Sequence, residues 1–363
     1  MKSSTGEHYL GLDHVRALAA FLVFTWHFIH GVDAKPVPYE GAPAIFPLAL
    51  LDEGHTGVAL FMVLSGYLFA KLLDGKDINY PGFFWNRFIR LAPLLILSFV
   101  LFGLQEALYG RSLTPFLNSL AAGFVAPTWP NGAWSIAIEI HFYLCLGLIF
   151  AAVRRWRPAP VVAVLAMIAI RALLFARDAD LQYLSYWTII GRADDFLLGI
   201  AAFSYRHLFR RKHLFAAMFF LVFCGLAWTF DDMGGLTLMR PRWPWIVIPS
   251  VEASGYAVLI AYYDTSFRPR NVGLSRFLAR IGVYSYSIYL LHFFVVFRAA
   301  KFINTHVMDI SNFYLACAIS AVVFCGMIPI GWLSYRFIEA PALSFRRPYL
   351  KTAPASSAVQ AAI

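Results

Sequence analysis

Apolar segments and short polar loops alternate along almost the whole of this chain. A helix of about 20 apolar residues rises about 30 Å and crosses the hydrocarbon core of a bilayer. The pattern therefore predicts an all-α, polytopic membrane protein with about ten transmembrane helices. The predicted spans are residues 13–31, 56–73, 90–109, 131–153, 159–176, 187–205, 214–230, 245–263, 281–300 and 312–337.

Two stretches of the chain depart from this alternation. Residues 111–130 are partly apolar but contain Pro115, Pro127 and Pro130, and we interpret them as an outer-face loop with an interfacial helix. Residues 351–363 are small and polar, and they are predicted to form a disordered tail. Residues 1–350, which show no internal repeat, are expected to form one membrane-embedded domain.

Lysine and arginine are distributed unequally between the two sets of loops. Under the predicted topology, 20 of them lie on one side and 8 on the other. The richer side is normally cytoplasmic, so both termini are predicted to lie in the cytoplasm. An even number of spans gives the same result. Residues 1–11 are polar, and no small-residue cleavage site follows the first apolar segment, which argues against a cleaved signal peptide.

The composition supports a membrane protein and argues against other classes. Of the 363 residues, 60% are hydrophobic and 14% are charged, and the mean hydropathy is +0.65. Soluble domains have about a quarter charged residues. The net charge of +10 comes from short loops, so no binding to nucleic acid is expected. The cysteines lack metal-ligand spacing, so no metal site is expected. They are Cys145, Cys224, Cys317 and Cys325.

Arg16 and His27 lie within the first predicted span. Eleven residues at 100° each return to nearly the same face of a helix, so the two side chains share one stripe. They lie about 16 Å apart along the axis, at 1.5 Å per residue. Ionisable residues inside a membrane usually face a bundle interior or a wet cavity. This stripe therefore indicates a functional site.

Arg87 and Arg90 lie at the start of the third predicted span and share a face. With Arg16 they form a set of three arginines near the cytoplasmic end of the helices. Arginine binds phosphate groups bidentately and keeps its charge at any working pH. The three residues suit a polyphosphate ligand that enters from the cytoplasm. The alternative interpretation is ordinary snorkelling of cytoplasmic arginines.

Ser135 and Glu139 are i,i+4 neighbours on the fourth predicted span. Glu139 lies about two turns from the outer surface, at a depth comparable to that of His27. A carboxylate beside an imidazole fixes its tautomer and supports a role as general base. We therefore predict that Glu139 is the partner of His27. The alternative is a buried carboxylate satisfied by Arg192 or by a backbone group.

Three further groups of polar residues have both a structural and a functional interpretation. Arg192 either pairs with the neighbouring acids Asp194 and Asp195 or lines a site near the outer side. Residues 284–292 carry a polar face that either lines a cavity or joins helices by hydrogen bonds. The segment Leu64-Ser65-Gly66 is interpreted as a site of close helix packing. The signatures of soluble hydrolases, nucleotide-binding loops and zinc enzymes are missing.

Taken together, these residues resemble acyltransferase family 3, the O-antigen acetylase type of membrane protein. Each motif alone is weak, but six occur in order at the expected spans, and the resemblance covers essentially the whole chain. The matching residues are Leu12, Asp13, Arg16 and His27; Leu64, Ser65 and Gly66; Arg87 and Arg90; Trp134, Ser135 and Glu139; Ser285, Ser287, Tyr289 and His292; and Glu339 and Pro341.

The chain departs from the family pattern in two respects. The family commonly has a second Glu and a Gln after the first Glu of the Trp-Ser motif, whereas Ile140 and His141 follow Glu139 here. No role is therefore expected for a second carboxylate at this point. The soluble hydrolase-like domain that is fused to some members is not expected in this chain. Transfer to the acceptor is then expected to finish on the membrane domain or on a separate partner.

The resemblance implies an enzyme of the bacterial inner membrane. It would transfer an acyl group, often acetyl, from cytoplasmic acyl-CoA to a hydroxyl of a cell-surface or exported glycan or a lipid-linked saccharide. Acyl-CoA would be the donor substrate, with no permanently bound cofactor and with membrane lipids around the protein. Arg16, Arg87 and Arg90 would hold the CoA phosphates, and His27 would act as general base with Glu139. Direct transfer and an acyl-His or acyl-Ser intermediate are both compatible with the sequence.

Two other functions fit part of the pattern. The runner-up is a transporter or flippase of an anionic lipid-linked sugar or acyl donor, with the same arginines at its entry site. The lack of an internal repeat weighs against it. The other is a structural or sensory membrane protein without turnover, and the aligned Arg16 and His27 weigh against that function.

Overall fold

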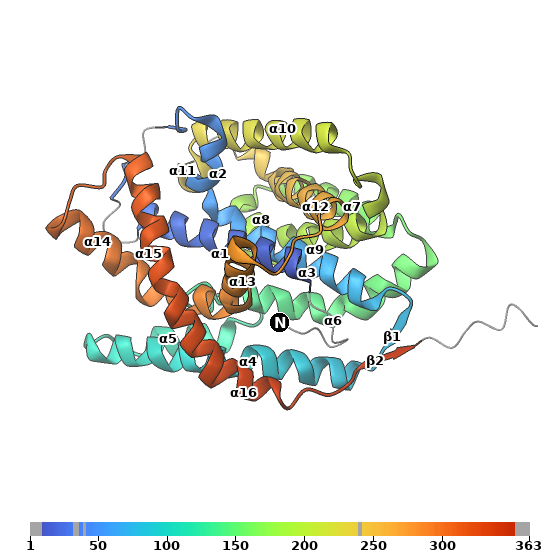
Figure 1. The fold of residues 1–363 in the computed structure, drawn as a ribbon, viewed down its shortest axis with the longest axis horizontal. Helices are drawn as coiled ribbons and strands as arrows, with labels where there is room; N and C mark the ends of the chain where they lie inside the picture. Colours follow the sequence, from blue (N-terminus) through green and yellow to red (C-terminus); the bar gives the residue numbers. More distant parts are fainter. Residues whose placement is uncertain (1–8, 32–35, 39–40, 239–241, 353–363) are drawn as a thin grey trace, which may run out of the picture.

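The computed structural model describes residues 9–31, 36–38, 41–238 and 242–352. They fold into a helical bundle with one short two-stranded ribbon (Figure 1). The α-helices are α1 (Leu10–His30), α2 (Ala49–Asp52), α3 (Gly57–Leu73), α4 (Tyr80–Leu108), α5 (Thr114–Ala122), α6 (Trp134–Arg155), α7 (Ala159–Phe175), α8 (Leu181–Trp187), α9 (Ile189–Ser204), α10 (His213–Asp232), α11 (Gly235–Leu238), α12 (Ile248–Ser266), α13 (Gly273–Leu291), α14 (Val296–His306), α15 (Phe313–Ser334) and α16 (Ala340–Leu343). The strands are β1 (Lys76–Ile78) and β2 (Leu350–Thr352).

The all-α prediction is confirmed, and a helix occupies each of the ten predicted spans. Among the described residues, six helices are long and apolar enough to cross a membrane, or seven if one bent pair counts as a span. The remaining predicted spans fall short because α7 and α9 have only 17 and 16 residues, and α9 and α12 contain buried charges. The number of ten spans and the cytoplasmic termini therefore stay predictions.

Large apolar side chains face outward on the long helices. Leu108 of α4, Leu148 of α6, Leu214 of α10 and Val322 of α15 are all exposed. Such a surface is costly in water and ordinary in lipid, because hydrocarbon solvates apolar side chains. The exposed surface thus agrees with the membrane location that the apolar segments predict.

Helix α1 runs through the middle of the bundle and packs against α3, α13 and α15 (Figure 1). Helix α3 crosses α9 at close range. A Cβ added at Gly66 would lie 2.1 Å from the backbone oxygen of Phe196, and one added at Gly199 would lie 2.1 Å from the oxygen of Val63. Small residues allow helix backbones to approach this closely. The predicted close-packing role of Leu64-Ser65-Gly66 is therefore confirmed.

The predicted span 281–300 is broken in the structure. Helix α13 ends at Leu291, a 3₁₀ turn covers His292–Phe294, and α14 continues at an angle of 53°. Non-helical backbone at membrane depth occurs where protein buries it or where it lines a cavity. The break lies at His292, one of the predicted site residues.

The region between α4 and α6 contains the predicted interfacial helix. Helix α5 spans nine residues, none of them buried. Pro115 lies in its first turn, where its missing N–H costs nothing, so it starts the helix instead of breaking it. The structure thus confirms a short helix here, and its place at the membrane surface stays a prediction.

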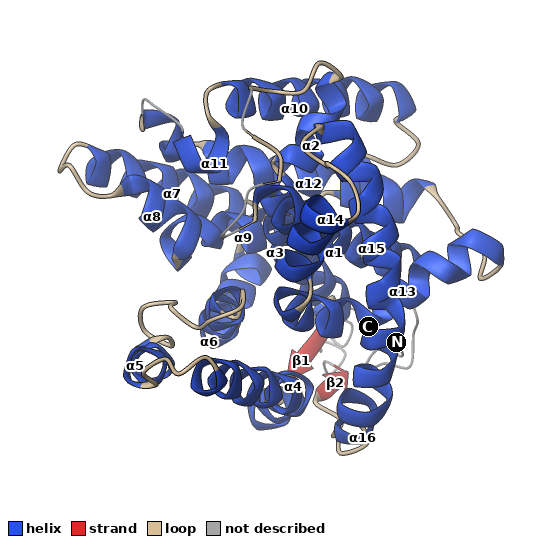
Figure 2. Cartoon of the chain, turned by 90° about the vertical axis from the view of Figure 1, so that its left-hand side faces the viewer, coloured by secondary structure: helices blue, strands red, loops and turns tan. Residues whose placement is uncertain are grey.

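The C-terminal part of the chain returns to the start of α4. After α15, a π-helical turn (Tyr335–Glu339) and α16 lead to β2, which pairs antiparallel with β1. Figure 2 shows both strands beside α4. The predicted start of the disordered tail at residue 351 is therefore too early in the chain, because Lys351 and Thr352 belong to β2. The cross-strand hydrogen bonds outweigh the weak intrinsic propensity of this polar segment. Residues 353–363 lie outside the described residues.

Candidate functional site

A pocket of about 180 Å³ lies between α1, α3, α4, α6, α13 and the C-terminal segment. Its polar lining comes from parts of the chain that are far apart in sequence. Along α3, the lining residues run from Leu72 to Val58, which is about 21 Å at 1.5 Å per residue. The polar lining residues used below are Asp13, Arg16, Ser65, Asn86, Arg87, Arg90, Ser135, Glu139, Ser285, Tyr286, Tyr289 and Arg346.

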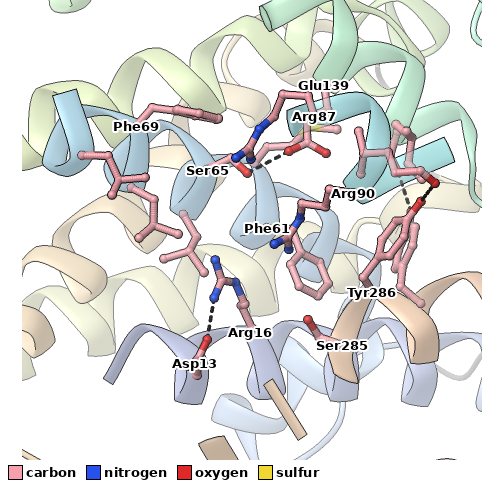
Figure 3. Close-up of a pocket in the computed structure, with 18 of the residues that line it drawn as sticks. Asp13, Arg16, Phe61, Ser65, Phe69, Arg87, Arg90, Glu139, Ser285 and Tyr286 are labelled. Carbon is pink, nitrogen blue, oxygen red and sulfur yellow. Dashed lines mark hydrogen bonds and ion pairs between the residues drawn. The ribbon is translucent and has the colours of Figure 1, made fainter. Parts of the chain in front are cut away.

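The structure brings the three predicted arginines together. Arg16, Arg87 and Arg90 point from two different helices into the same space (Figure 3). Arg16 forms an ion pair with Asp13, one helical turn earlier. Arg87 lies over the rings of Phe69 and Phe83, 5.3 and 5.6 Å from their centroids. Aromatic faces and the carboxylates of Asp13 and Glu139 only partly balance these charges, so the pocket favours an anion.

Glu139 lines the middle of this pocket and does not contact His27. Its carboxylate accepts a hydrogen bond from Ser65 at 3.2 Å and another from Tyr143. Its charge acts on Arg87, which lies beside it (Figure 3). The predicted pairing of Glu139 with His27 is therefore wrong. Similar depth did not imply contact, because α6 packs mainly against α9 and α7, whereas α1 packs against α3 and α13.

His27 lies outside the pocket and is surrounded by aromatic rings. Its neighbours are Trp26, His292 and Phe293, with ring centroids 4.7, 5.0 and 4.5 Å away. The Nδ1 atom lies 2.8 Å from the backbone oxygen of Val23. A carbonyl oxygen can only accept, so Nδ1 of the neutral ring carries the hydrogen. The lone pair is then on Nε2, and no described residue donates a hydrogen bond to it.

Ser135 and Tyr289 form the end of the pocket nearest to His27, called here the far end. Their hydroxyls lie 2.8 Å apart, and Tyr289 also donates to the backbone oxygen of Gly132 at 3.0 Å. The ring of His292 lies 5.9 Å from that of Tyr289 and 5.0 Å from that of His27. One layer of rings thus separates the far end from His27, and the predicted polar face of residues 284–292 contributes to it.

Arg192, Asp194 and Asp195 lie away from the pocket, in buried ion pairs. Arg192 contacts Asp195 at 3.4 Å and Glu252 of α12 at 3.2 Å. Asp194 contacts Arg171 of α7 at 2.7 Å. Buried charges need partners of this kind. The geometry favours the structural interpretation of these residues, which join α7, α9 and α12.

Ser287 also lies outside the pocket. Its hydroxyl hydrogen-bonds to Ser334, at 3.0 Å, and to the buried carboxyl of Glu339. These bonds tie α13 to the π-helical turn that follows α15. Ser287 therefore holds the C-terminal part of the chain in place.

Several polar lining residues were not among the predicted site residues, including Ser65, Asn86, Tyr286 and Arg346. Ser65 and Tyr286 lie within predicted motifs, and Asn86 lies next to one. Tyr286 donates a hydrogen bond to the backbone oxygen of Leu91 at 2.7 Å. For these three residues, the predicted motifs in or beside which they lie were the only sequence indication of a place in the site. Arg346 had none, because it lies in a polar segment without helical periodicity. Among the described residues, no group of His, Cys, Asp and Glu is arranged to hold a metal ion.

These features define a helical integral membrane protein with a cationic pocket that ends near two histidines whose rings meet edge to face. The chain belongs to acyltransferase family 3, described as "Acyltransferase domain", whose family profile matches residues 9–333. This membership argues against the alternative of a transporter or flippase.

Three relatives illustrate the membership. A proposed peptidoglycan O-acetyltransferase of Bacillus subtilis (strain 168), YrhL, is 28% identical over 91% of this chain and 54% of its own length. The acyltransferase MdmB of Streptomyces mycarofaciens is 24% identical over 85% of this chain and 86% of its own. A proposed O-acetyltransferase of Staphylococcus aureus (strain MRSA252) is 23% identical over 94% and 59%. This chain thus spans about half the length of YrhL. No solved structure matches the chain.

Proposed function

We propose that this protein transfers an acyl group, acetyl in the simplest case, from cytoplasmic acyl-CoA to a hydroxyl of a cell-surface or exported glycan. The observation that carries the proposal is the arginine-lined pocket whose far end lies one layer of rings from His27. The names of YrhL and of the Staphylococcus aureus relative support O-acetylation, and that of YrhL supports a glycan acceptor. The membrane would be the bacterial inner membrane.

The pocket suits an extended donor with phosphates at one end. The phosphates of CoA would bind the arginines, and the pantetheine arm would lie along α3 toward Ser135 and Tyr289. The arm needs a length comparable to the separation of Arg16 and His27, about 16 Å along α1. The thioester carbonyl would then reach the far end, next to His292 and one layer of rings from His27.

His27 would act as general base through Nε2. It takes the proton of the acceptor hydroxyl as the oxygen attacks the thioester carbonyl. The C–S bond then breaks, and the leaving thiolate receives that proton from the imidazolium. The backbone oxygen of Val23 stabilises the protonated ring at Nδ1. This direct transfer needs no acyl-enzyme. A mechanism with an acyl intermediate on Ser135 or His27 would bind the donor in the same position.

A purified sample in lipid nanodiscs tests the proposal. With acetyl-CoA alone we expect slow release of free CoA, and with a soluble glycan acceptor we expect faster release with acetylation of the glycan. Mass spectrometry of the acceptor and thiol titration measure the two products. Movement of a labelled saccharide across a vesicle membrane without CoA release would contradict the proposal and favour a transporter.

A further inference from the structure

The segment after α16 is fastened to the start of α4. The side chain of Asn86 donates to the backbone oxygen of Arg347 at 2.6 Å and accepts from its backbone N–H at 2.9 Å. The indole of Trp85 donates to the backbone oxygen of Phe345 at 3.0 Å. Hydrogen bonds on either side of residue 346 therefore fix the backbone from which its side chain projects.

The ribbon holds the same segment from the other end. The backbone N–H of Asn79 donates to the oxygen of Tyr349 at 2.8 Å, and β2 pairs with β1 immediately beyond. Tyr349 is 2% exposed and packs its ring on Phe83, 5.6 Å away. A buried aromatic anchor of this kind is a stable contact, because it removes a large apolar surface from water. The segment is thus a wall of the pocket.

Arg346 lines the pocket together with Arg87 and Arg90. Burial and the charges of Arg90 and Arg87 lower the pKa of Arg346 to about 10. The guanidinium still carries its charge at neutral pH, but it does so among other cations. Four arginines face two carboxylates, Asp13 and Glu139, in the pocket lining. Like charges at close range repel, so an anion with more than one charge relieves this arrangement.

We propose that Arg346 binds a phosphate group of the donor, and that the C-terminal segment is an integral part of the donor site. The inference rests on the proposed function in that it takes the donor to be a phosphorylated thioester. Arg346 lies outside residues 9–333, the part matched by the family. The ligand class is a multiply charged phosphate anion such as a diphosphate, because four arginines and two carboxylates leave a net positive charge in the pocket lining.

Arg347 offers a matched control. It carries the same charge one residue further on, but it is exposed and lies over the ring of Trp85 at 5.3 Å. Only its backbone takes part in the hydrogen bonds with Asn86. Arg347→Ala therefore changes the net charge of the protein as Arg346→Ala does, while the clamp on the segment stays intact.

The test measures equilibrium binding to the full-length protein in nanodiscs. The probes are CoA, inorganic pyrophosphate and pantetheine, which lacks phosphate. We expect Arg346→Ala to weaken CoA and pyrophosphate binding by about 10- to 100-fold, the loss of one or two charge-assisted hydrogen bonds. Arg346→Lys should recover part of the lost affinity, and the difference in affinity between Arg346→Ala and the wild type should be smaller at high salt. Arg347→Ala should change CoA binding less than about twofold, and pantetheine binding should be the same in all variants.

Each other outcome has a definite consequence. Unchanged CoA binding by Arg346→Ala, or an equal loss in Arg347→Ala, overturns the inference. Should Arg346→Ala fail to fold, Arg346→Gln keeps the length of the side chain, and wild-type affinity in that variant overturns it equally. If the wild type binds pyrophosphate through Arg346 but does not bind CoA, the anion site stands and the proposed function fails. If the wild type binds neither, both fail.

Discussion

At the scale of single residues, His27 has the arrangement that a general base needs. Its Nδ1 donates to the backbone oxygen of Val23, and this bond fixes the ring so that Nε2 faces away from α1's own backbone. Phe293 and His292 pack on the ring and restrict its rotation. The backbone carbonyl thus fixes the tautomer of His27, which a carboxylate partner was predicted to do.

His27→Ala should lower the rate of acyl transfer by about 100- to 10,000-fold, the usual effect of losing a general base. Steady-state assays of glycan acetylation check this, with His213→Ala as the control, because His213 is exposed on α10 and bonds to Tyr262. Near-normal transfer by His27→Ala would remove His27 from the mechanism.

Glu139→Gln tests the corrected place of this carboxylate. It lies beside Arg87 and accepts hydrogen bonds from Ser65 and Tyr143. The amide of Gln disturbs these hydrogen bonds, so the KM for acyl-CoA should rise several-fold. That is about the effect on binding of losing one hydrogen bond. The pH dependence of kcat should stay the same, because Glu139 does not contact His27. A shifted acid limb of the kcat profile would show that the two residues meet during turnover.

The sequence predicted some of these residues because their spacing on one helix carries the information. Arg16 and His27 share a helix face, and so do Arg87 and Arg90, and the structure keeps both relations. The contact of Glu139 was predicted wrongly, because depth in a membrane does not determine which faces of two helices meet. Arg346 was beyond prediction, because contacts with the distant start of α4, such as the hydrogen bonds to Asn86, bring its segment to the pocket.

At the scale of elements, the crossing of α3 and α9 positions one wall of the pocket. Ser65 faces the pocket and Gly66 faces α9, so the small residue allows the close approach that holds Ser65 in place. The sequence predicted this contact from residue size. The sequence did not predict the break between α13 and α14, because no Pro or Gly lies near His292. The break therefore depends on how the side chains around it pack.

Gly66→Ala should destabilise the protein by about 1–3 kcal/mol, the usual cost of overpacking, because the new methyl group meets the backbone of Phe196. Thermal unfolding in detergent measures the effect. Gly225→Ala on α10 is the control: nothing lies within 4 Å of its added Cβ, so this change should leave stability the same or raise it slightly. A Gly66→Ala protein as stable as the wild type would mean that α3 and α9 lie further apart.

At the scale of the whole molecule, the arrangement has two functional ends. The arginines and the C-terminal segment lie near the start of α4, and His27 lies in the last turns of α1. The Lys and Arg distribution predicts that the first end faces the cytoplasm. The donor and the acceptor would then approach from opposite sides of the membrane and meet at the far end of the pocket.

Vesicles with the protein in one orientation test this central claim most directly. Acetyl-CoA is supplied to one face, the glycan acceptor to the other, and acetylation of the glycan is measured. We expect transfer when acetyl-CoA is on the face that carries both termini, and none when it is on the opposite face, because the charged donor cannot cross hydrocarbon unaided. Equal acetylation with the donor on either face would contradict a pocket that takes acyl-CoA from the cytoplasm.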